Sequence, residues 1–549
     1  MTDGSISSSS SSSSEQTHPA FVRLLVPAVG DLIFVALLFL LVFTPLSVRL
    51  LGDAGIGWHI RTGQMILQTG AVPRVDPFSS IMQGKPWFAW EWLYDVIVGG
   101  AEASAGLDGV VAFNAGVIAL VFALLFFLLR RRGTGMCLAV GLTILAASAS
   151  MIHFLARPHV MTWLGVVLWL GWLDDSGTGS ADDAARQNRR LLWLLPASII
   201  LWTNLHGGFL TGFVMLAAFL AGQFAGWMRT TRLSSFASVD AAARVRVLVI
   251  SGMLSGLATL VNPYGWHLHA HIYRYLTNRW LMDHVQEFQS PNFHDPAVKC
   301  FVVLLGLVII AFGVRTRAVR LTEYLLVLFA VGSGLYSARN LPVAAILLAM
   351  VAGPVLSGSL AQRGAGRPRG LVSKLRLRSL RMESTDAGLY GHVWPVIAVV
   401  IVAAIAWQGK HSAGGRSIIQ ARFDPHRFPE AAIQKLRAEH DGEPVLVPDY
   451  WGGYFIYELY PARLVVVDDR HDLYGADRFK SYLKMYRLEA GWNEFIDSNL
   501  VRLIVVPKDG TLAQGLSQDP AWQVTATDDV ATTFRRREVK DPSQSRLFQ

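Results

Sequence analysis

Acidic and basic side chains gather in the stretch that follows the first long apolar run of the chain. This stretch, "LLGDAGIGWHIRTGQMILQTGAVPRVDPFSS" at 50–80, holds Asp53, His59, Arg61 and Asp76. Carboxylates take protons from hydroxyl groups, and guanidinium groups bind phosphate through a fixed fork of N–H donors. The stretch therefore has the residue types that acid–base chemistry beside a phosphate group requires.

Further polar residues of the same types lie in short motifs between the later apolar runs. Glu91 and Asp95 are four apart in "GKPWFAWEWLYD", a spacing that puts both carboxylates on one face of a helix. The other candidates are Lys85 of the same motif, Arg157 and His159 of "ARPHV", His206 of "WTNLHGGF", and Arg339 of "SARN".

Several of these features also have an ordinary structural explanation. Asp53 suits a cap on the amphipathic helix predicted to begin near Gly55, because a carboxylate accepts from exposed helix N–H groups. Asp76 precedes a proline and suits a turn cap. "WHLHAH" puts His267 and His271 one helical turn apart, which fits either a metal pair or interfacial histidines. The sequence leaves these alternatives open.

Two features stand out near the C-terminus. The run "DDRHD" at 468–472 follows a predicted strand, where α/β folds place loops that contact ligands. A charged loop on a solvated face is the alternative. Gly452 and Gly453 of "PDYWGGYF" predict a tight turn between strands.

The elements that would position these residues are membrane helices. Hydrophobic residues make up 52% of the 549 residues and charged residues only 16%, whereas soluble domains carry about 25% charged residues. Many apolar runs reach the length of roughly 17–25 residues that crosses a membrane as a helix. We predict about eleven spans, at 32–51, 109–130, 136–154, 159–173, 191–204, 208–228, 247–262, 298–314, 321–337, 341–358 and 391–407.

Lys and Arg residues are concentrated in alternate loops, which predicts an N-terminus inside and a C-terminus outside the membrane. The candidate residues then fall almost entirely on the outer side, which predicts an outward-facing site at the membrane boundary. Basic inner loops also account for the net charge of +9, so nucleic acid is not expected as a partner. Cys137 and Cys300 would lie near opposite faces, too far apart for a disulfide.

The predicted fold class is mainly α, a multi-pass bundle with a C-terminal extracytoplasmic α/β domain. A disordered, Ser-rich cytoplasmic tail at 1–29 precedes the transmembrane domain at 30–407, whose long external loops are 52–108 and 263–297. The α/β domain occupies 408–549. Its predicted strands are "EPVLVP", "RLVVVD", "RLIVVP" and "TTFRRR", and its predicted helices are "PEAAIQKLRAEH" and "DRFKSYLKMYRLEAGWNEFID".

The motifs around 50–108 resemble the first external loop of the GT-C class of integral-membrane glycosyltransferases, which includes dolichyl-phosphate-mannose and aminoarabinose transferases. In that class an acidic motif precedes an interfacial helix and a "KPP" element. Here the order is Asp53, "IRTGQMILQTGAVP" and "GKPWFAWEWL". The chain is still more similar to a bacterial group of GT-C-like membrane proteins that shares the "WH…DPFS", "W.NLHGGF" and "GGY…DDR" motifs.

The resemblance implies an enzyme of the inner (plasma) membrane that transfers a sugar from a polyprenyl-phosphate-linked donor to a glycan, lipid or protein acceptor on the outer face. It implies that Asp53 acts at the acceptor or near the metal and the lipid phosphate, and that Lys85 lies near the donor phosphate. Ala54 replaces the second acid of the family motif. Asp76 and Glu91 are the substitutes for Asp53 as base. The expected substrate-binding residues are His59, Arg61, Lys85, Arg157, His159, His206 and Arg339.

The sequence leaves three points open. The cofactor is undetermined, with a divalent cation as one option. A lipid or glycan transporter or flippase is the rival function, although few ionisable residues fall in the middle of the predicted spans. A non-catalytic glycan-assembly membrane protein that relies on the outer domain is the third.

Overall fold

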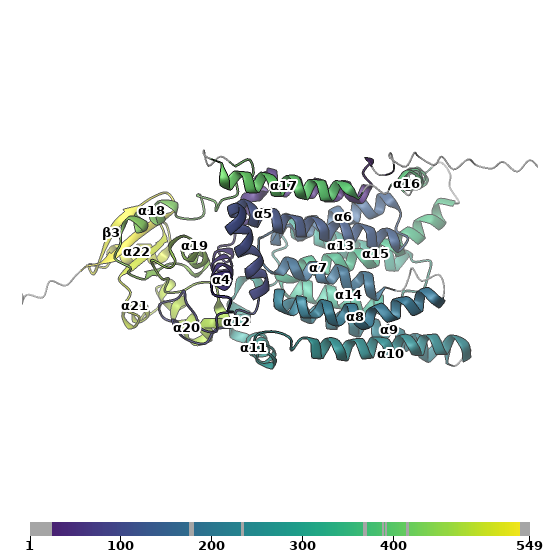
Figure 1. Ribbon diagram of the computed structural model, residues 1–549, viewed down its shortest axis with the longest axis horizontal. Helices are drawn as coiled ribbons and strands as arrows, with labels where there is room; N and C mark the ends of the chain where they lie inside the picture. The colour runs from purple at the N-terminus through teal and green to yellow at the C-terminus, as the bar shows by residue number, and fades with distance from the viewer. Residues whose placement is uncertain are drawn as a thin grey trace, which may run out of the picture.

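The computed structural model describes residues 23, 25–174, 181–231, 235–365, 370–386, 389, 392–412 and 417–537. A bundle of long, roughly parallel helices forms one part of the molecule, and a small α/β domain stands at one end of the bundle (Figure 1). Most of the predicted Ser-rich tail lies outside the described residues.

Each of the predicted apolar spans coincides with a helix of the bundle. The helices are α2 (Val29–Phe43), α5 (Trp92–Arg131), α6 (Met136–Ser150), α7 (His159–Leu173), α8 (Ala181–Leu205), α9 (Leu210–Thr230), α10 (Ser235–Ala258), α13 (Pro296–Val314), α14 (Leu321–Tyr336), α15 (Leu341–Ala365) and α17 (Val393–His411).

Within the described residues, seven helices are long and apolar enough to cross a membrane, and α2, α7 and α14 are shorter apolar helices. The chain is therefore a multi-pass membrane protein, while the number of eleven crossings stays a prediction. Short elements connect the bundle helices, namely α3 (Leu46–Leu50), η1 (Met151–His153), η2 (Gly207–Phe209) and η4 (Ala338–Asn340). Cys137 and Cys300 are both free thiols, as the topology predicted.

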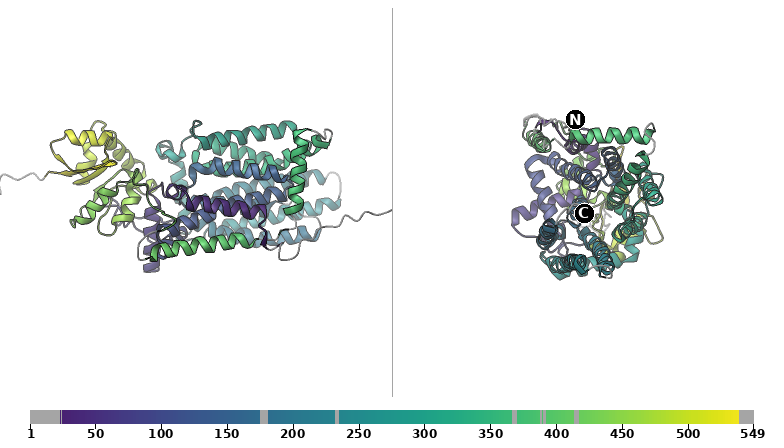
Figure 2. Two further views of the ribbon diagram at one scale, coloured as in Figure 1. Left: turned by 90° about the horizontal axis from the view of Figure 1, so that it is seen from above. Right: turned by 90° about the vertical axis from the view of Figure 1, so that its right-hand side faces the viewer.

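The two ends of the bundle differ in what covers them. Helix α16 (Leu371–Asp386) crosses the end far from the α/β domain (Figure 2), and the Asp386 carboxylate accepts a hydrogen bond from the Val29 N–H at 2.8 Å. The start of α2 therefore lies at this end. At the other end α11 (Trp266–Thr277), α12 (Arg279–His284) and η3 (Gln286–Phe288) lie between the bundle and the α/β domain (Figure 1).

Helix α4 (Ile56–Thr69) and the first part of α5 run across the bundle axis, between the bundle and the α/β domain (Figure 1). The predicted start of α4 near Gly55 is confirmed. Helix α5 is interrupted at Ala105 and at Gly106, whose φ of +64° is a conformation that favours glycine. The interruption separates the transverse part of α5 from the part that runs along the bundle.

The C-terminal domain contains a four-stranded mixed sheet in the order β1 (Val445–Leu446), β2 (Leu503–Pro507), β4 (Ala531–Arg536) and β3 (Trp522–Thr527). β1 and β2 are parallel, and the other neighbours are antiparallel. The helices of the domain are α18 (Glu430–Ala438), α19 (Asp449–Leu459), α20 (His471–Tyr486), α21 (Asn493–Ser498) and α22 (Thr511–Gln518).

The prediction of an α/β domain with strands at β1, β2 and β4 is confirmed, whereas the predicted strand "RLVVVD" is wrong. Val465 makes only isolated parallel bridges, one to Val445 and one to Ser79 of the first external loop. The Ser80 N–H donates to the Val465 carbonyl at 2.8 Å. Backbone hydrogen bonds therefore connect the first external loop to the α/β domain. Strand β3 was not predicted from the sequence.

The predicted turn at Gly452 and Gly453 is also wrong, because both residues belong to helix α19. A Cβ atom on Gly453 would lie 2.1 Å from the Ala54 carbonyl oxygen, and one on Gly452 would lie 2.5 Å from Cα of Asp468. The glycines are present because α19 packs its backbone directly against the start of α4 and against the 468–472 segment.

Candidate functional site

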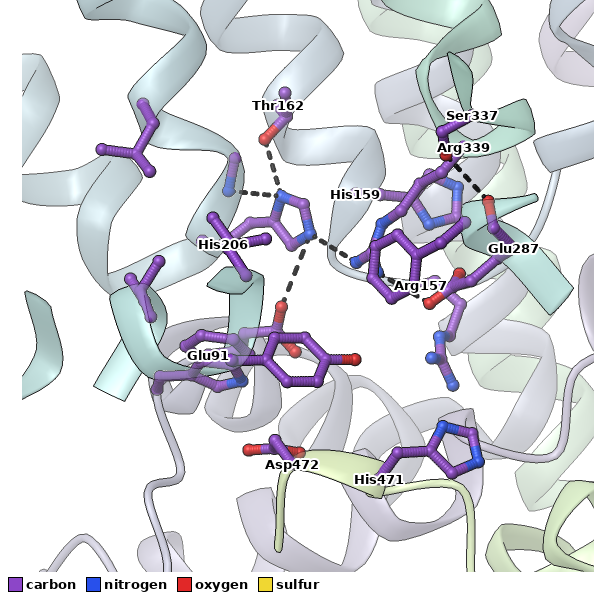
Figure 3. Close-up of a pocket in the computed structure, with 18 of the residues that line it drawn as sticks. Glu91, Arg157, His159, Thr162, His206, Glu287, Ser337, Arg339, His471 and Asp472 are labelled. Atoms are coloured by element: carbon purple, nitrogen blue, oxygen red, sulfur yellow. Dashed lines mark hydrogen bonds and ion pairs between the residues drawn. The ribbon is translucent and has the colours of Figure 1, made fainter. Parts of the chain in front are cut away.

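A partly open pocket of about 370 Å³ lies at the end of the bundle that faces the α/β domain (Figure 3). Its walls come from loops and helix ends that are far apart in the sequence, at 87–91, 157–163, 206–211, 272–288, 336–343 and 469–472. Aromatic rings and ionisable side chains alternate around it. The rings belong to Trp58, Trp87, Phe88, Trp90, Trp163, Tyr275, Phe288 and Tyr336.

Glu91 stands at the base of the pocket, at the residue that precedes helix α5. Its Oε1 lies 3.5 Å from His206 Nε2, and its Oε2 lies 3.8 Å from His59 Nε2. Burial raises the pKa of Glu91 to about 7, because ionisation in an apolar environment is costly. A carboxylate with this pKa can both take up and release a proton near neutral pH.

His206 is oriented by its other ring nitrogen (Figure 3). The Gly208 N–H donates to Nδ1 at 3.1 Å, and the Thr162 hydroxyl lies 2.7 Å from the same nitrogen. Since a backbone N–H can only donate, Nδ1 accepts, and Nε2 is the ring nitrogen that faces Glu91. Burial, together with Arg339, whose Nη2 lies 3.2 Å from Nε2, holds the pKa of His206 well below its usual value.

Arginines supply positive charge on the opposite wall. Arg339 donates through Nη1 to Glu287 Oε1 at 2.7 Å, and its guanidinium lies 5.5 Å from the centre of the Phe288 ring. Arg157 Nη1 binds two carboxylates, Asp469 Oδ2 at 2.8 Å and Asp53 Oδ1 at 3.1 Å. Each arginine retains further N–H donors, because a guanidinium group has five.

These ion pairs also set the pKa values of the acids. Burial tends to raise the pKa of Glu287, but Arg339 and Arg157 outweigh it and lower that pKa. Burial raises the pKa of Asp469 to about 6, although Arg157 opposes the increase. Glu287 is therefore a permanent anion at neutral pH, whereas Asp469 and Glu91 are closer to titration.

The α/β domain contributes the segment 469–472 to the pocket wall. Arg470 is buried, with Nη1 2.7 Å from Asp76 Oδ1 and Nη2 2.6 Å from Asp468 Oδ2. The neighbouring side chains have separate partners: His471 Nε2 lies 2.9 Å from an Asp449 oxygen, and Asp472 Oδ2 lies 3.0 Å from His271 Nε2. The segment is thus a partly buried wall of the pocket, and the alternative of a solvated charged loop is wrong.

Five of the predicted site residues line this pocket, and five do not. The lining residues are Glu91, Arg157, His159, His206 and Arg339. The others are Asp53, His59, Arg61, Asp76 and Lys85. Lys85 is exposed, and Arg61 donates to the Tyr457 carbonyl on helix α19 at 2.9 Å.

Asp53 and Asp76 combine the structural roles that the sequence left open with ion pairs to arginine. Asp53 Oδ1 accepts the Gly55 N–H at 2.8 Å in addition to its contact with Arg157. Asp76 accepts the N–H groups of Phe78 and Ser79 in a turn, in addition to its contact with Arg470.

Thr162, Glu287 and Ser337 of the pocket wall are not among the predicted site residues. Ser337 follows α14 and donates to the Glu287 backbone carbonyl at 2.9 Å, which joins η4 to η3 (Figure 3). Glu287 lies within the predicted external loop 263–297, but no motif marks it. Asp283 and Asp295 are the other acidic residues of that loop, so residue type alone did not single out Glu287.

The predicted histidine pair does not converge on a common point. His271 binds Asp472 and stacks on the Phe88 ring at 4.5 Å, whereas the His267 ring stacks on Trp266 at 4.0 Å. Among the described residues, no group of three His, Cys, Asp or Glu side chains is arranged to hold a metal ion.

Comparison with protein-family models and with curated proteins finds no match to this sequence. Solved structures show that the chain shares its fold with GT-C enzymes, which confirms the resemblance at the level of the fold. One is the Archaeoglobus fulgidus oligosaccharyltransferase tethered with an acceptor peptide containing the NVT sequon. The TM-score is 0.50 at 12% identity, covering 87% of this chain and 68% of that one. Another is ArnT from Cupriavidus metallidurans in the apo state, with a TM-score of 0.50 at 14% identity, covering 92% of this chain and 97% of that one.

Proposed function

We propose that the protein is a glycosyltransferase that moves a sugar from a polyprenyl-phosphate-linked donor to an acceptor on the outer face of the membrane. The observation that carries the proposal is the pocket itself, in which Glu91 lies across from Arg157 and Arg339. Sugar transfer needs a base for the acceptor and positive charge for the departing phosphate, and these residues supply both.

In the proposed reaction, Glu91 takes the proton of an acceptor hydroxyl or amide group. The electron pair released on the acceptor atom forms the new bond to the anomeric carbon of the sugar. The bond between that carbon and the phosphate oxygen breaks, and its electron pair stays on the lipid phosphate. Arg339 and Arg157 stabilise the phosphate through their free N–H groups.

The mouth of the pocket supports a lipid donor. Tyr336, Leu276 and Leu210 belong to the pocket lining, and they are 67%, 49% and 39% exposed on the outside of the protein. Large apolar side chains at the rim of a membrane-embedded bundle fit the hydrocarbon of a lipid. A polyprenyl chain can therefore stay in the membrane while its phosphate enters the pocket.

The aromatic side chains support a sugar as the transferred group. Trp87, Trp90 and Tyr275 line the pocket together with the carboxylates of Asp469 and Asp472. Apolar faces of a sugar ring pack on aromatic rings, and its hydroxyl groups donate to carboxylates.

The proposed base is Glu91 instead of Asp53. Asp53 is outside the pocket lining and shares Arg157 with Asp469. Its proposed role is to orient Arg157. With the N-terminus inside the cell, the pocket and the α/β domain are on the outer face.

The test is to identify the lipid-linked sugar that accumulates when the protein is removed from the cell, and the face of the membrane on which it accumulates. We expect a polyprenyl-linked sugar to build up on the outer face, and we expect the wild-type gene to clear it. The Glu91→Gln variant should insert normally and fail to clear it. The matched control is Glu430→Gln, because Glu430 is an exposed glutamate on α18.

Two results would contradict the proposal. A lipid-linked sugar trapped on the inner face would indicate a flippase. Complementation by Glu91→Gln would indicate a binding or assembly protein that does not need the base.

A further inference from the structure

A buried histidine–aspartate pair lies directly behind Glu91. His59 Nδ1 is 2.6 Å from Asp95 Oδ1, and the exposed fractions of the two side chains are 1% and 0%. Neither residue lines the pocket. The pair can therefore act on a substrate only through a residue that does, and Glu91 is the residue in between.

The pair is fixed by direct backbone contact between α4 and α5. A Cβ atom on Gly63 would lie 1.8 Å from the Asp95 carbonyl oxygen, and one on Gly99 would lie 2.7 Å from the Gln64 nitrogen. The two helices cross at these glycines, one turn from His59. The His59 ring also contacts Trp58, with 3.6 Å between the ring centres and 30° between the ring planes. The imidazole consequently has a single orientation.

Two polar atoms of the pair are buried without a hydrogen-bond partner in the described structure, His59 Nε2 and Asp95 Oδ2. Unpaired buried polar atoms are rare in proteins because each forfeits its hydration. His59 Nε2 points toward Glu91, whose Oε2 is 3.8 Å away. A hydrogen bond would form after a shift of less than 1 Å, provided that one of the two atoms carries a proton.

We propose that neutral His59 accepts a hydrogen bond from Glu91 once Glu91 has taken the acceptor proton, and that Asp95 fixes the tautomer of His59 that makes this possible. In the resting site His59 Nδ1–H donates to Asp95, so Nε2 has a free electron pair that faces Glu91. The proton that Glu91 removes from the acceptor stays on Glu91 Oε2, and this O–H donates a hydrogen bond to His59 Nε2. The hydrogen bond stabilises the protonated form of Glu91 as the proton is taken up. This assignment rests on the proposed function.

The charged surroundings keep His59 neutral before the reaction. Burial and the positive charge of Arg157 hold its pKa well below the usual value, and His206, Arg470 and His159 act in the same direction. The acids that face it are Asp95 and Glu91, both from the start of α5. An imidazole that is neutral at rest has its acceptor nitrogen available at neutral pH.

The tautomer of His59 can be measured independently of enzyme activity, by ¹⁵N NMR spectra of purified, ¹⁵N-histidine-labelled protein in lipid nanodiscs. The His59 signals are assigned by their loss in His59→Gln. We expect a protonated Nδ1 and a bare Nε2 at neutral pH, and we expect Asp95→Asn to move the proton to Nε2. A protonated Nε2 in the wild type would overturn the proposal.

The second measurement is the transfer rate from the lipid-linked sugar that accumulates in cells lacking the protein. His59→Gln and Asp95→Asn should each lower kcat by about 100-fold or more and leave KM for the lipid within about twofold. His269→Gln is the matched control, because His269 bonds to Thr259 and lies outside the pocket lining. Rates within threefold of the wild type would show that the pair is only structural.

The failure of this proposal differs from that of the proposed function. If the wild-type protein transfers no sugar, the proposed function fails, and the nitrogen spectra alone decide whether His59 is the hydrogen-bond acceptor for Glu91. In that case Glu91→Gln should still change the titration of the His59 signals, and an unchanged titration would overturn the proposal.

Discussion

Arg470 Nη1 lies 2.7 Å from Asp76 Oδ1, with exposed fractions of 2% and 0% for the two side chains. The pair joins the α/β domain to the first external loop. Arg470 also donates to Asp468 through Nε at 2.9 Å and lies over the Trp87 ring at 4.7 Å. The segment that carries His471 and Asp472 is thereby held against the pocket, so the α/β domain is part of the site.

Replacing Asp76 with alanine should destabilise the protein strongly. The change removes one of the two carboxylates of a buried arginine, and breaking a buried ion pair costs about 3–5 kcal/mol. We expect a lower thermal unfolding midpoint and faster proteolytic release of the α/β domain. Asp477→Ala is the control, because the Asp477 side chain is fully exposed and its contact with Lys480 is 3.8 Å long. Equal stability of both variants would contradict the assignment.

The transfer rate should rise with pH around neutrality, because Glu91 acts as a base only when it is ionised. Burial raises the pKa of Glu91 to about 7, so the ionised fraction increases between about pH 6 and pH 8. Glu91→Gln should lower the rate by about 100- to 10,000-fold and remove this limb of the profile. The measurement is kcat against pH with the accumulated lipid-linked sugar. A wild-type profile that is flat across this range would argue against Glu91 as the base.

Arginine at position 339 should not be replaceable by lysine. Arg339 donates to Glu287 through Nη1 and keeps other N–H groups for a phosphate, whereas lysine offers one compact charge. We expect Arg339→Lys to weaken the binding of undecaprenyl phosphate in nanodiscs by about 10- to 100-fold. Arg274→Lys, on the exposed face of α11, serves as the control and should bind normally. Unchanged affinity in Arg339→Lys would exclude a phosphate contact.

The helices of the bundle could be predicted from the sequence because hydropathy depends on composition over a local window. Loop residues such as Glu91 and His206 could be selected because topology places them on one side of the membrane. Their partners could not be predicted in the same way. Arg157 lies 104 positions from Asp53 in the sequence, and Arg470 lies 394 positions from Asp76. A local motif therefore contains the carboxylate but not the arginine that pairs with it.

Local signals also failed where tertiary packing overrides them. Adjacent glycines at 452 and 453 are typical of a turn, yet here they allow two backbones to touch. Glu287 carries no motif, and its importance arises only from the position of Arg339 across the pocket. The sequence therefore predicts the membrane side and part of the residue set, while the pocket depends on contacts between distant segments.

A methyl group at position 453 should separate α19 from α4 and thereby distort the pocket, although residue 453 does not line it. The Cβ atom of alanine would lie 2.1 Å from the Ala54 carbonyl oxygen. This oxygen belongs to the backbone, so no side-chain rotation can relieve the clash. Overpacking of this kind costs about 1–3 kcal/mol. We expect Gly453→Ala to lower the unfolding midpoint and to weaken the binding of undecaprenyl phosphate, because α4 carries Trp58 of the pocket wall. Gly226→Ala is the matched control, since no atom lies within 4 Å of its added Cβ. Normal stability of Gly453→Ala would mean that α19 does not need this close contact with α4.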